Sequence, residues 1–271
     1  MLKIMKNSSV NPGNDLMPVI FVGHGSPMNA IEGNEFTRGW QQMSARVPRP
    51  RAVLCISAHW ETSGTLITAM DNPETIHDFG GFPEELYKVQ YPALGQPEFA
   101  EDLIRRLANH DLATDMDWGL DHGCWSVIRH FYPDADVPVL QLSLDYRKQP
   151  SEHYALGKEL AFLRREGILI VGSGNIVHNL RMVDWRNVTG GYDWAEEASA
   201  KIQSLIREEN HKALIDFGQL GKEIDLAVPT PEHYLPLLYV LALSDKKDSL
   251  TVYNDKCTMG SLSMTSFFFG D

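Results

Sequence analysis

The stretch Ile168-Leu169-Ile170-Val171-Gly172-Ser173-Gly174-Asn175-Ile176-Val177-His178 joins a short apolar run to a glycine-rich turn and a histidine. Two earlier stretches repeat this pattern. His24 follows the apolar run 19–22, and His59 follows the run 53–57. Short runs rich in Val and Ile are typical of the buried strands of a parallel sheet. Because open α/β sheets bind ligands beyond the carboxyl ends of their strands, these three histidines are expected to share one crevice.

Short apolar runs alternate with longer amphipathic segments along the rest of the chain. The expected strands are 19–22, 52–57, 66–69, 138–144, 168–171, 251–253 and 262–268. The expected helices are 35–45, 98–109, 125–131, 152–165, 194–210 and 231–243, the last with Pro231 in its first turn and Thr230 as its N-cap. This alternation predicts a single α/β domain with a central, mostly parallel sheet and helices on both faces. The domain is expected to span 18–271 after a flexible N-terminal tail, 1–17, with the irregular stretches 71–97 and 179–193 shaping a pocket.

Composition excludes several classes of partner. Lys and Arg number 24 and Asp and Glu number 36, a formal net charge of −12, so nucleic acid is not an expected partner. The longest apolar run, 235–243, is broken by Pro236 and is too short to cross a membrane. The three cysteines, Cys55, Cys124 and Cys257, fit reduced thiols, and no signal-peptide stretch opens the chain. We therefore expect a cytoplasmic protein, while its oligomeric state is left open.

A fourth histidine, His233, lies in the turn-forming segment Pro229-Thr230-Pro231-Glu232-His233-Tyr234. Neutral imidazole is the commonest protein ligand for zinc and iron. A shared metal centre therefore explains four histidines at turns better than four unrelated structural roles do. Two histidines with the Glu232 carboxylate would match the ligand set of non-haem Fe(II) oxygenases. Three histidines with an open position would suit catalytic zinc. Ligand type alone leaves both possibilities open.

A second cluster, Asp121-His122-Gly123-Cys124-Trp125, opens a predicted helix. His122 is a candidate proton shuttle, and the alternative is a structural role in which Asp121 caps the helix. Cys124 is not expected to be a nucleophile, because adjacent side chains on a helix do not face each other. The segment 76–83 is either a loop that closes over a flat ligand or a surface loop with a buried Phe. Four further histidines lie in helix-like or charged segments and are expected to be surface residues: His110, His130, His153 and His211.

Taken together, these motifs resemble the class III extradiol ring-cleaving dioxygenases, and within them the bacterial single-domain members of the 4,5-DOPA extradiol dioxygenase group. The resemblance runs from about Met17 to the C-terminus. It rests on these segments, in this order: Val22-Gly23-His24-Gly25-Ser26-Pro27, Ser57-Ala58-His59-Trp60, Ile76-His77-Asp78-Phe79-Gly80-Gly81-Phe82-Pro83, Asp121-His122-Gly123, Gly174-Asn175-Ile176-Val177-His178-Asn179-Leu180 and Thr230-Pro231-Glu232-His233-Tyr234-Leu235.

The resemblance implies a metal held by His24, His59 and His233, with Glu232 as the alternative third ligand. It implies that His178 is either a fourth ligand or the catalytic base, and that His122 is an acid/base residue of the substrate pocket. Fe(II) is expected to support dioxygenase activity. Zn(II) is expected in purified protein, since it suits an all-histidine site and lies above Fe(II) in the affinity order.

The expected reaction opens the ring of a catechol, DOPA or a relative, with O₂ beside its hydroxyl groups and yields a muconic semialdehyde. One alternative is a zinc hydrolase whose metal-bound water is the nucleophile. Another is a metal-binding protein without catalysis. The sequence leaves the physiological catechol open.

Overall fold

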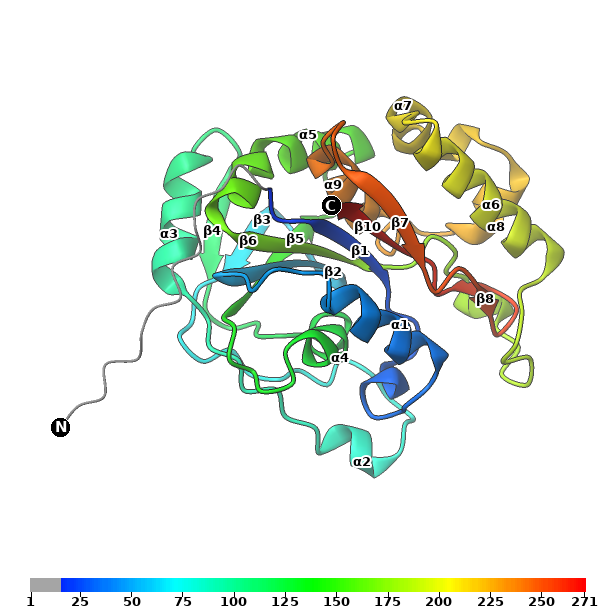
Figure 1. The fold of residues 1–271 in the computed structure, drawn as a ribbon, viewed down its shortest axis with the longest axis horizontal. Coiled ribbons are helices and arrows are strands. Elements are labelled where there is room, and N and C mark those ends of the chain that lie inside the picture. The colour runs from blue at the N-terminus through cyan, green and yellow to red at the C-terminus, as the bar shows by residue number, and fades with distance from the viewer. Residues whose placement is uncertain (1–15) are drawn as a thin grey trace.

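The computed structural model describes residues 16–271, and within them an eight-stranded sheet forms the centre of the molecule (Figure 1). Its strand order is β4-β3-β5-β2-β6-β1-β10-β7. The strands are β1 Val19–Gly23, β2 Ala52–Thr62, β3 Thr65–Thr68, β4 Leu112–Asp115, β5 Val139–Asp145, β6 Ile168–Gly174, β7 Ser249–Tyr253 and β10 Ser266–Gly270, with a separate hairpin of β8 Cys257–Thr258 and β9 Leu262–Ser263.

The middle of the sheet is parallel, and the antiparallel pairs lie toward its two ends. Strands β1, β6, β2 and β5 pair in parallel in that order, as do β3 and β4. The antiparallel pairs are β1 with β10, β10 with β7, and β3 with β5. In this parallel centre the carboxyl ends of β1, β2 and β6 meet at one edge of the sheet. His24, His59 and His178 lie at or just after these strand ends.

Helices cover both faces of the sheet, as predicted (Figure 1). They are α1 Glu35–Ser44, α2 Glu84–Tyr87, α3 Pro97–Arg106, α4 His122–Phe131, α5 Pro150–Glu159, α6 Asp193–Arg207, α7 His211–Ile215, α8 Lys222–Ala227 and α9 Leu235–Leu243. Short 3₁₀ turns are η1 Pro27–Ala30, η2 Leu160–Glu166, η3 Leu180–Met182 and η4 Phe217–Gln219. Helices α1 and α4 pack on one face, and α5, α6 and α9 pack on the other. The prediction of a single α/β domain is confirmed.

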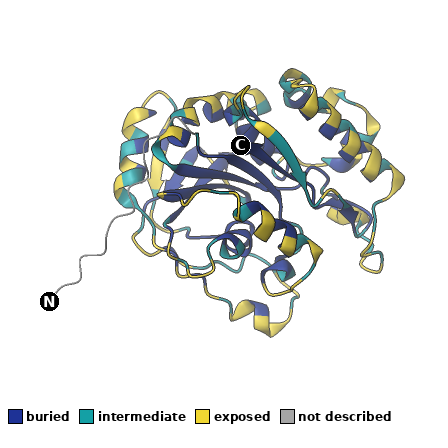
Figure 2. Ribbon diagram, viewed as in Figure 1, coloured by how far each residue is buried: buried dark blue, intermediate teal, exposed yellow. Residues whose placement is uncertain are grey.

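Alternation along β1 explains why both faces are covered. Val19 and Phe21 belong to the hydrophobic cluster of α5 and α9, whereas Ile20 and Val22 belong to the cluster of α1 and α4. Successive side chains of a strand point to opposite faces, so a strand that is apolar at every position needs cover on both. Figure 2 shows the result: the central strands are buried, and exposed residues lie on the outer sides of the helices.

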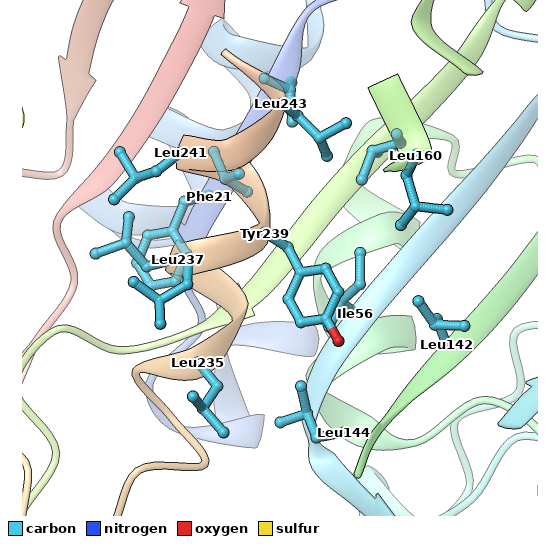
Figure 3. Packing of buried hydrophobic residues seen from close by; sticks show 14 of the residues in the cluster. Phe21, Ile56, Leu142, Leu144, Leu160, Leu235, Leu237, Tyr239, Leu241 and Leu243 are labelled. Carbon is cyan, nitrogen blue, oxygen red and sulfur yellow. The ribbon is translucent and has the colours of Figure 1, made fainter. Parts of the chain in front are cut away.

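Helix α9 is apolar all round and lies in the core (Figure 3). A helix that is hydrophobic on every side is stable only when it is enclosed by other elements. The predicted start of this helix at Pro231, with Thr230 as cap, is wrong. Residues 231–234 form a turn in which the Leu235 N–H donates to the Pro231 carbonyl, and Pro236 lies in the first turn of the helix. This turn carries His233.

The predicted surface position of His153 is also wrong. His153 in α5 is fully buried, and its Nδ1 lies 3.0 Å from the Tyr239 hydroxyl of α9. Burial lowers the pKa of His153 to about 4. Residues His110, His130 and His211 are half-buried. The charged segment around His153 suggested solvent, but α9 covers that side of α5.

The predicted N-terminal tail lies outside the described residues apart from 16 and 17. Met17 is buried, and its carbonyl accepts a hydrogen bond of 2.6 Å from Arg164 Nε. Among the helices of residues 16–271, none has the length and apolar character needed to span a bilayer.

Candidate metal centre and active site

Three of the predicted ligands converge at the carboxyl edge of the sheet. His24 directly follows β1, His59 lies near the end of β2, and His233 lies in the turn before α9. One ligand nitrogen from each lies within 4.8 Å of the others, and His24 Nε2 is 3.1 Å from His59 Nε2. The pairing of β2 with β5 shifts register between Ile56 and Glu61, so an irregularity of the strand accompanies the position of His59.

Ser173 determines which nitrogen of His24 carries the proton. Its hydroxyl donates to the Gly123 carbonyl at 2.6 Å, and its oxygen lies 3.0 Å from His24 Nδ1. A serine has a single O–H to donate, so the second contact requires His24 Nδ1–H as the donor. The lone pair of His24 is therefore on Nε2, which faces His59.

His233 has the same arrangement. Its Nδ1 lies 3.1 Å from Glu232 Oε1, a carboxylate that also accepts from the Thr230 hydroxyl at 2.9 Å. Its Nε2 is buried and has no hydrogen-bond partner among residues 16–271. Unpartnered buried nitrogens are rare in folded proteins, and a metal ion is one of the groups that satisfies them. Glu232 thus lies against the outer nitrogen of His233, which leaves the histidine to face the centre.

Asp78 contacts the remaining pair of histidines. Its Oδ2 lies 2.8 Å from His122 Nδ1 and 3.5 Å from His59 Nδ1, and its Oδ1 accepts from the His122 backbone N–H at 2.8 Å. The rings of His59 and His122 are 3.9 Å apart between centroids. The sequence indicated the segment 76–83 but did not distinguish Asp78, because its partner is 44 residues away.

Burial keeps four of the site histidines neutral: His24, His59, His178 and His233. It lowers the pKa of His24 and of His233 well below the ordinary value, and the neighbouring imidazoles lower both further. Burial also lowers the pKa of His59 to about 3 and that of His178 to about 4. Neutral imidazole is the form that binds metal, so the site holds its ligands in the required protonation state near pH 7.

His178 lies beside the three converging nitrogens. Its ring stacks on that of His233 with 3.4 Å between centroids and 10° between planes. A ring nitrogen of His178 lies within 4.8 Å of ligand atoms of Glu232 and His233, and His178 is not part of the cluster of His24, His59 and His233. The side chain is half-buried, so it can reach a bound molecule.

The capping role of Asp121 is confirmed, while the proton-shuttle role of His122 stays a prediction. Asp121 is fully buried and caps α4, since its side chain accepts from the Cys124 N–H at 3.0 Å. His122, the first residue of that helix, faces the histidine cluster. Burial raises the pKa of Cys124 well above its usual value, in agreement with the prediction that this thiol is not a nucleophile.

A groove of about 1040 Å³ is lined by residues that neighbour the site histidines in sequence or in strand pairing, although no histidine is among its lining residues. Ser26 lies two residues after His24, and Leu262 pairs with His178 in an isolated bridge. The irregular stretches predicted to shape a pocket contribute part of its walls: Gly80, Gly81, Phe82 and Pro83 from the first, and Trp185 and Val188 from the second. In the first stretch, Phe79 packs edge-on against the ring of His122, with 5.5 Å between centroids.

Comparisons with known proteins show the family to which the chain belongs. A family model described as the catalytic LigB subunit of aromatic ring-opening dioxygenase matches residues 18–269. The chain is 46% identical over 259 residues to the 4,5-DOPA dioxygenase extradiol of Escherichia coli (strain K12), covering 94% of this chain and 95% of that protein. It is 32% identical over 263 residues to the Beta vulgaris protein of the same name, covering 94% and 97%.

The fold has a solved counterpart. The crystal structure of an uncharacterised protein from Escherichia coli K12 matches with a TM-score of 0.80 at 40% identity, covering 94% of this chain and 100% of that one. The resemblance drawn from the motifs is therefore confirmed for the family. This chain belongs to the LigB family of aromatic ring-opening dioxygenases and is an extradiol ring-cleaving enzyme.

Proposed function

We propose that this protein opens the ring of DOPA or a related catechol, and that its metal binds to Nε2 of His24, His59 and His233. One observation carries this assignment. His24 and His233 have a hydrogen-bond partner at Nδ1 (Ser173 and Glu232), and Asp78 Oδ2 lies 3.5 Å from Nδ1 of His59, which leaves Nε2 of all three for a shared ion. Such outer partners are typical of metal-binding histidines, because they orient the ring and fix its tautomer.

The spacing of the donor atoms fits one ion. Two nitrogens that each bind at about 2.0–2.1 Å are separated by about 3.0–3.4 Å, and the His24–His59 nitrogens are 3.1 Å apart. Three neutral imidazoles suit Fe(II) and Zn(II) alike, so we infer that the purified protein carries zinc and that iron is the active metal. Fe(II) supplies O₂ activation at such a site, whereas Zn(II), which has no redox chemistry, does not.

The protein side chains supply binding and proton transfer. His178 is neutral and half-buried, so a ring nitrogen can accept a proton from a catechol hydroxyl. We assign it the role of base, since its stack on His233 sets it beside the three proposed ligands. His122 is the second acid/base candidate. Phe79, packed on His122, helps to exclude water from the reacting ring.

The substrate class follows from the relatives. Proteins named 4,5-DOPA dioxygenase extradiol match this chain along most of its length, so DOPA is the first catechol to test. The ring opens beside the hydroxyls to a muconic semialdehyde, with O₂ as the second substrate. A cytoplasmic location is part of the proposal, and the three unpaired, buried cysteines support it.

The test is an oxygen-electrode assay. Protein loaded anaerobically with Fe(II) and given L-DOPA and air is expected to consume O₂ and form a yellow product, and zinc-loaded protein is expected to do neither. His178→Ala is expected to bind the metal and lose most of the turnover. Fully iron-loaded protein that consumes no O₂ across a panel of catechols would overturn the proposal. Anaerobic hydrolysis of esters by the zinc form would replace it with a hydrolase.

A further inference from the structure

We propose that Asp78 is a positioning residue that holds the ring proton of His122 on Nδ1 and so presents Nε2, without a hydrogen, to the substrate. The inference deepens the proposed function, and its kinetic part rests on that function. It concerns a carboxylate outside the expected ligand set, in a loop that the sequence connected with the pocket only in general terms.

The contacts of Asp78 with His122 use both carboxylate oxygens. Oδ1 accepts from the backbone N–H of His122, and Oδ2 lies 2.8 Å from Nδ1 of the same residue. An ionised carboxylate can only accept, so the ring nitrogen in this contact must be the donor. No hydrogen bond within residues 16–271 engages His122 Nε2, and the residue is largely buried, with 5% of its surface exposed. A bare Nε2 accepts a hydrogen bond from a catechol hydroxyl and cannot donate one.

The loop that carries Asp78 is held by contacts on both sides of this residue. The indole N–H of Trp125 donates to the Ile76 carbonyl at 2.8 Å, and the Ile76 N–H donates to the Leu120 carbonyl at 2.7 Å. On the other side of Asp78, the Phe79 ring packs against His122 and Trp125. The segment before α4 and the first turns of that helix thus hold the loop that carries Asp78 in place by hydrogen bonds and ring packing.

Asp78 also links His122 to the proposed metal ligand His59. The same oxygen that contacts His122 Nδ1 lies 3.5 Å from His59 Nδ1, and the two rings lie against each other. The longer distance makes this a weaker contact. We therefore expect Asp78 to orient His122 strongly and His59 weakly.

The experiment compares Asp78→Asn with the wild type. In asparagine an NH₂ donor replaces one of the two carboxylate oxygens, so one of the two positions that accept from His122 in the wild type now donates. Nitrogen-15 NMR of the zinc-loaded, substrate-free protein, with the His122 signal assigned by its loss in His122→Gln, is expected to report Nδ1–H in the wild type. In Asp78→Asn it is expected to report a shift toward Nε2–H.

The kinetic arm uses the iron-loaded enzyme. In Asp78→Asn we expect kcat to fall about 10- to 100-fold, the usual range for such outer partners, with KM changed less than kcat and zinc affinity reduced less than 10-fold. Asp78→Glu, which keeps the charge, is expected to recover part of kcat. The matched control is Asp71→Asn, an exposed residue earlier in the same irregular stretch, which is expected to behave as the wild type.

Three results would overturn the inference. The first is Nε2–H in wild-type His122, and the second is a kcat loss in Asp78→Asn with an unchanged tautomer. The third is an unchanged kcat in a variant with a shifted tautomer, since the tautomer would then be irrelevant to turnover. If the wild type turned over no catechol, the proposed function would fail, while the NMR arm would still decide whether Asp78 sets the tautomer.

Discussion

Replacing Ser173 by alanine tests whether its hydrogen bond to His24 sets the tautomer that binds metal, or whether Ser173 only packs in the core. Ser173 is fully buried, and its oxygen is the partner of His24 Nδ1. Without it, the Nδ1–H of His24 loses its acceptor, a loss worth about 1–3 kcal/mol of folding free energy for a buried donor. The ring is then free to carry its proton on Nε2, the nitrogen that the metal needs.

The expected effect on metal binding follows from the same contact. Loss of an outer partner of a ligand typically weakens binding about 10- to 100-fold, which corresponds to about 1.4–2.7 kcal/mol. The assay is competition for Zn(II) against a chelator of known affinity, together with urea unfolding of the metal-free protein. Both the Kd for zinc and the free energy of unfolding are expected to change.

Ser126→Ala is the matched control. Ser126 is also buried, lies in the neighbouring helix α4, and has a hydroxyl without a hydrogen-bond partner in the part of the chain that the structure describes. Its removal is expected to leave both the zinc affinity and the stability unchanged, or to raise stability slightly. If Ser173→Ala bound zinc as tightly as the wild type while losing stability, Ser173 would be structural only, and the tautomer argument would be refuted.

Three further predictions test the packing and the electrostatics. His153 has a pKa of about 4 in the folded protein, below its unfolded value, so the unfolded state binds the extra proton as the pH falls. The stability of the wild type relative to His153→Gln is therefore expected to decrease by about 2 kcal/mol between pH 7 and pH 5, measured by urea unfolding; a pH-independent difference would contradict this. A Cβ at Gly123 would lie 2.5 Å from Ser57 Oγ and 2.8 Å from the His59 ring. Gly123→Ala is thus expected to weaken zinc binding, whereas Gly218→Ala, with open space around its Cβ, should not; equal affinities would count against the predicted position of His59. Leu238→Ala in the enclosed helix α9 is expected to lose about 2–5 kcal/mol by thermal or urea unfolding, and a loss below 1 kcal/mol would mean that α9 is not a core helix.

The sequence predicted the histidine positions well because the signal is local. Each of His24, His59 and His178 follows an apolar run, and the rule that parallel strands end at one edge brings such residues together. What stayed hidden depends on contacts between distant segments. The pairing of Asp78 with His122 and of Ser173 with His24 leaves no periodic pattern, and neither residue type is unusual in a turn.

The errors in secondary structure have similar causes. Strand β4 was not predicted because it is four residues long, lies at the sheet edge, has only Leu112 buried and includes Thr114 and Asp115. Pro231 and Thr230 carry helix-start signals, yet the helix begins only at Leu235, after the turn that carries His233. His153 lies among charged residues, and only the packing of α9 on α5 makes it buried.

The central claim is that three imidazoles share one ion through the same ring nitrogen. A crystal structure of the metal-loaded protein, with anomalous scattering recorded at the metal edge, tests it. The account predicts a single ion at about 2.0–2.2 Å from Nε2 of His24, His59 and His233, with Glu232 not bound to it. An ion bound through any Nδ1, or through Glu232 in place of His233, would contradict the account.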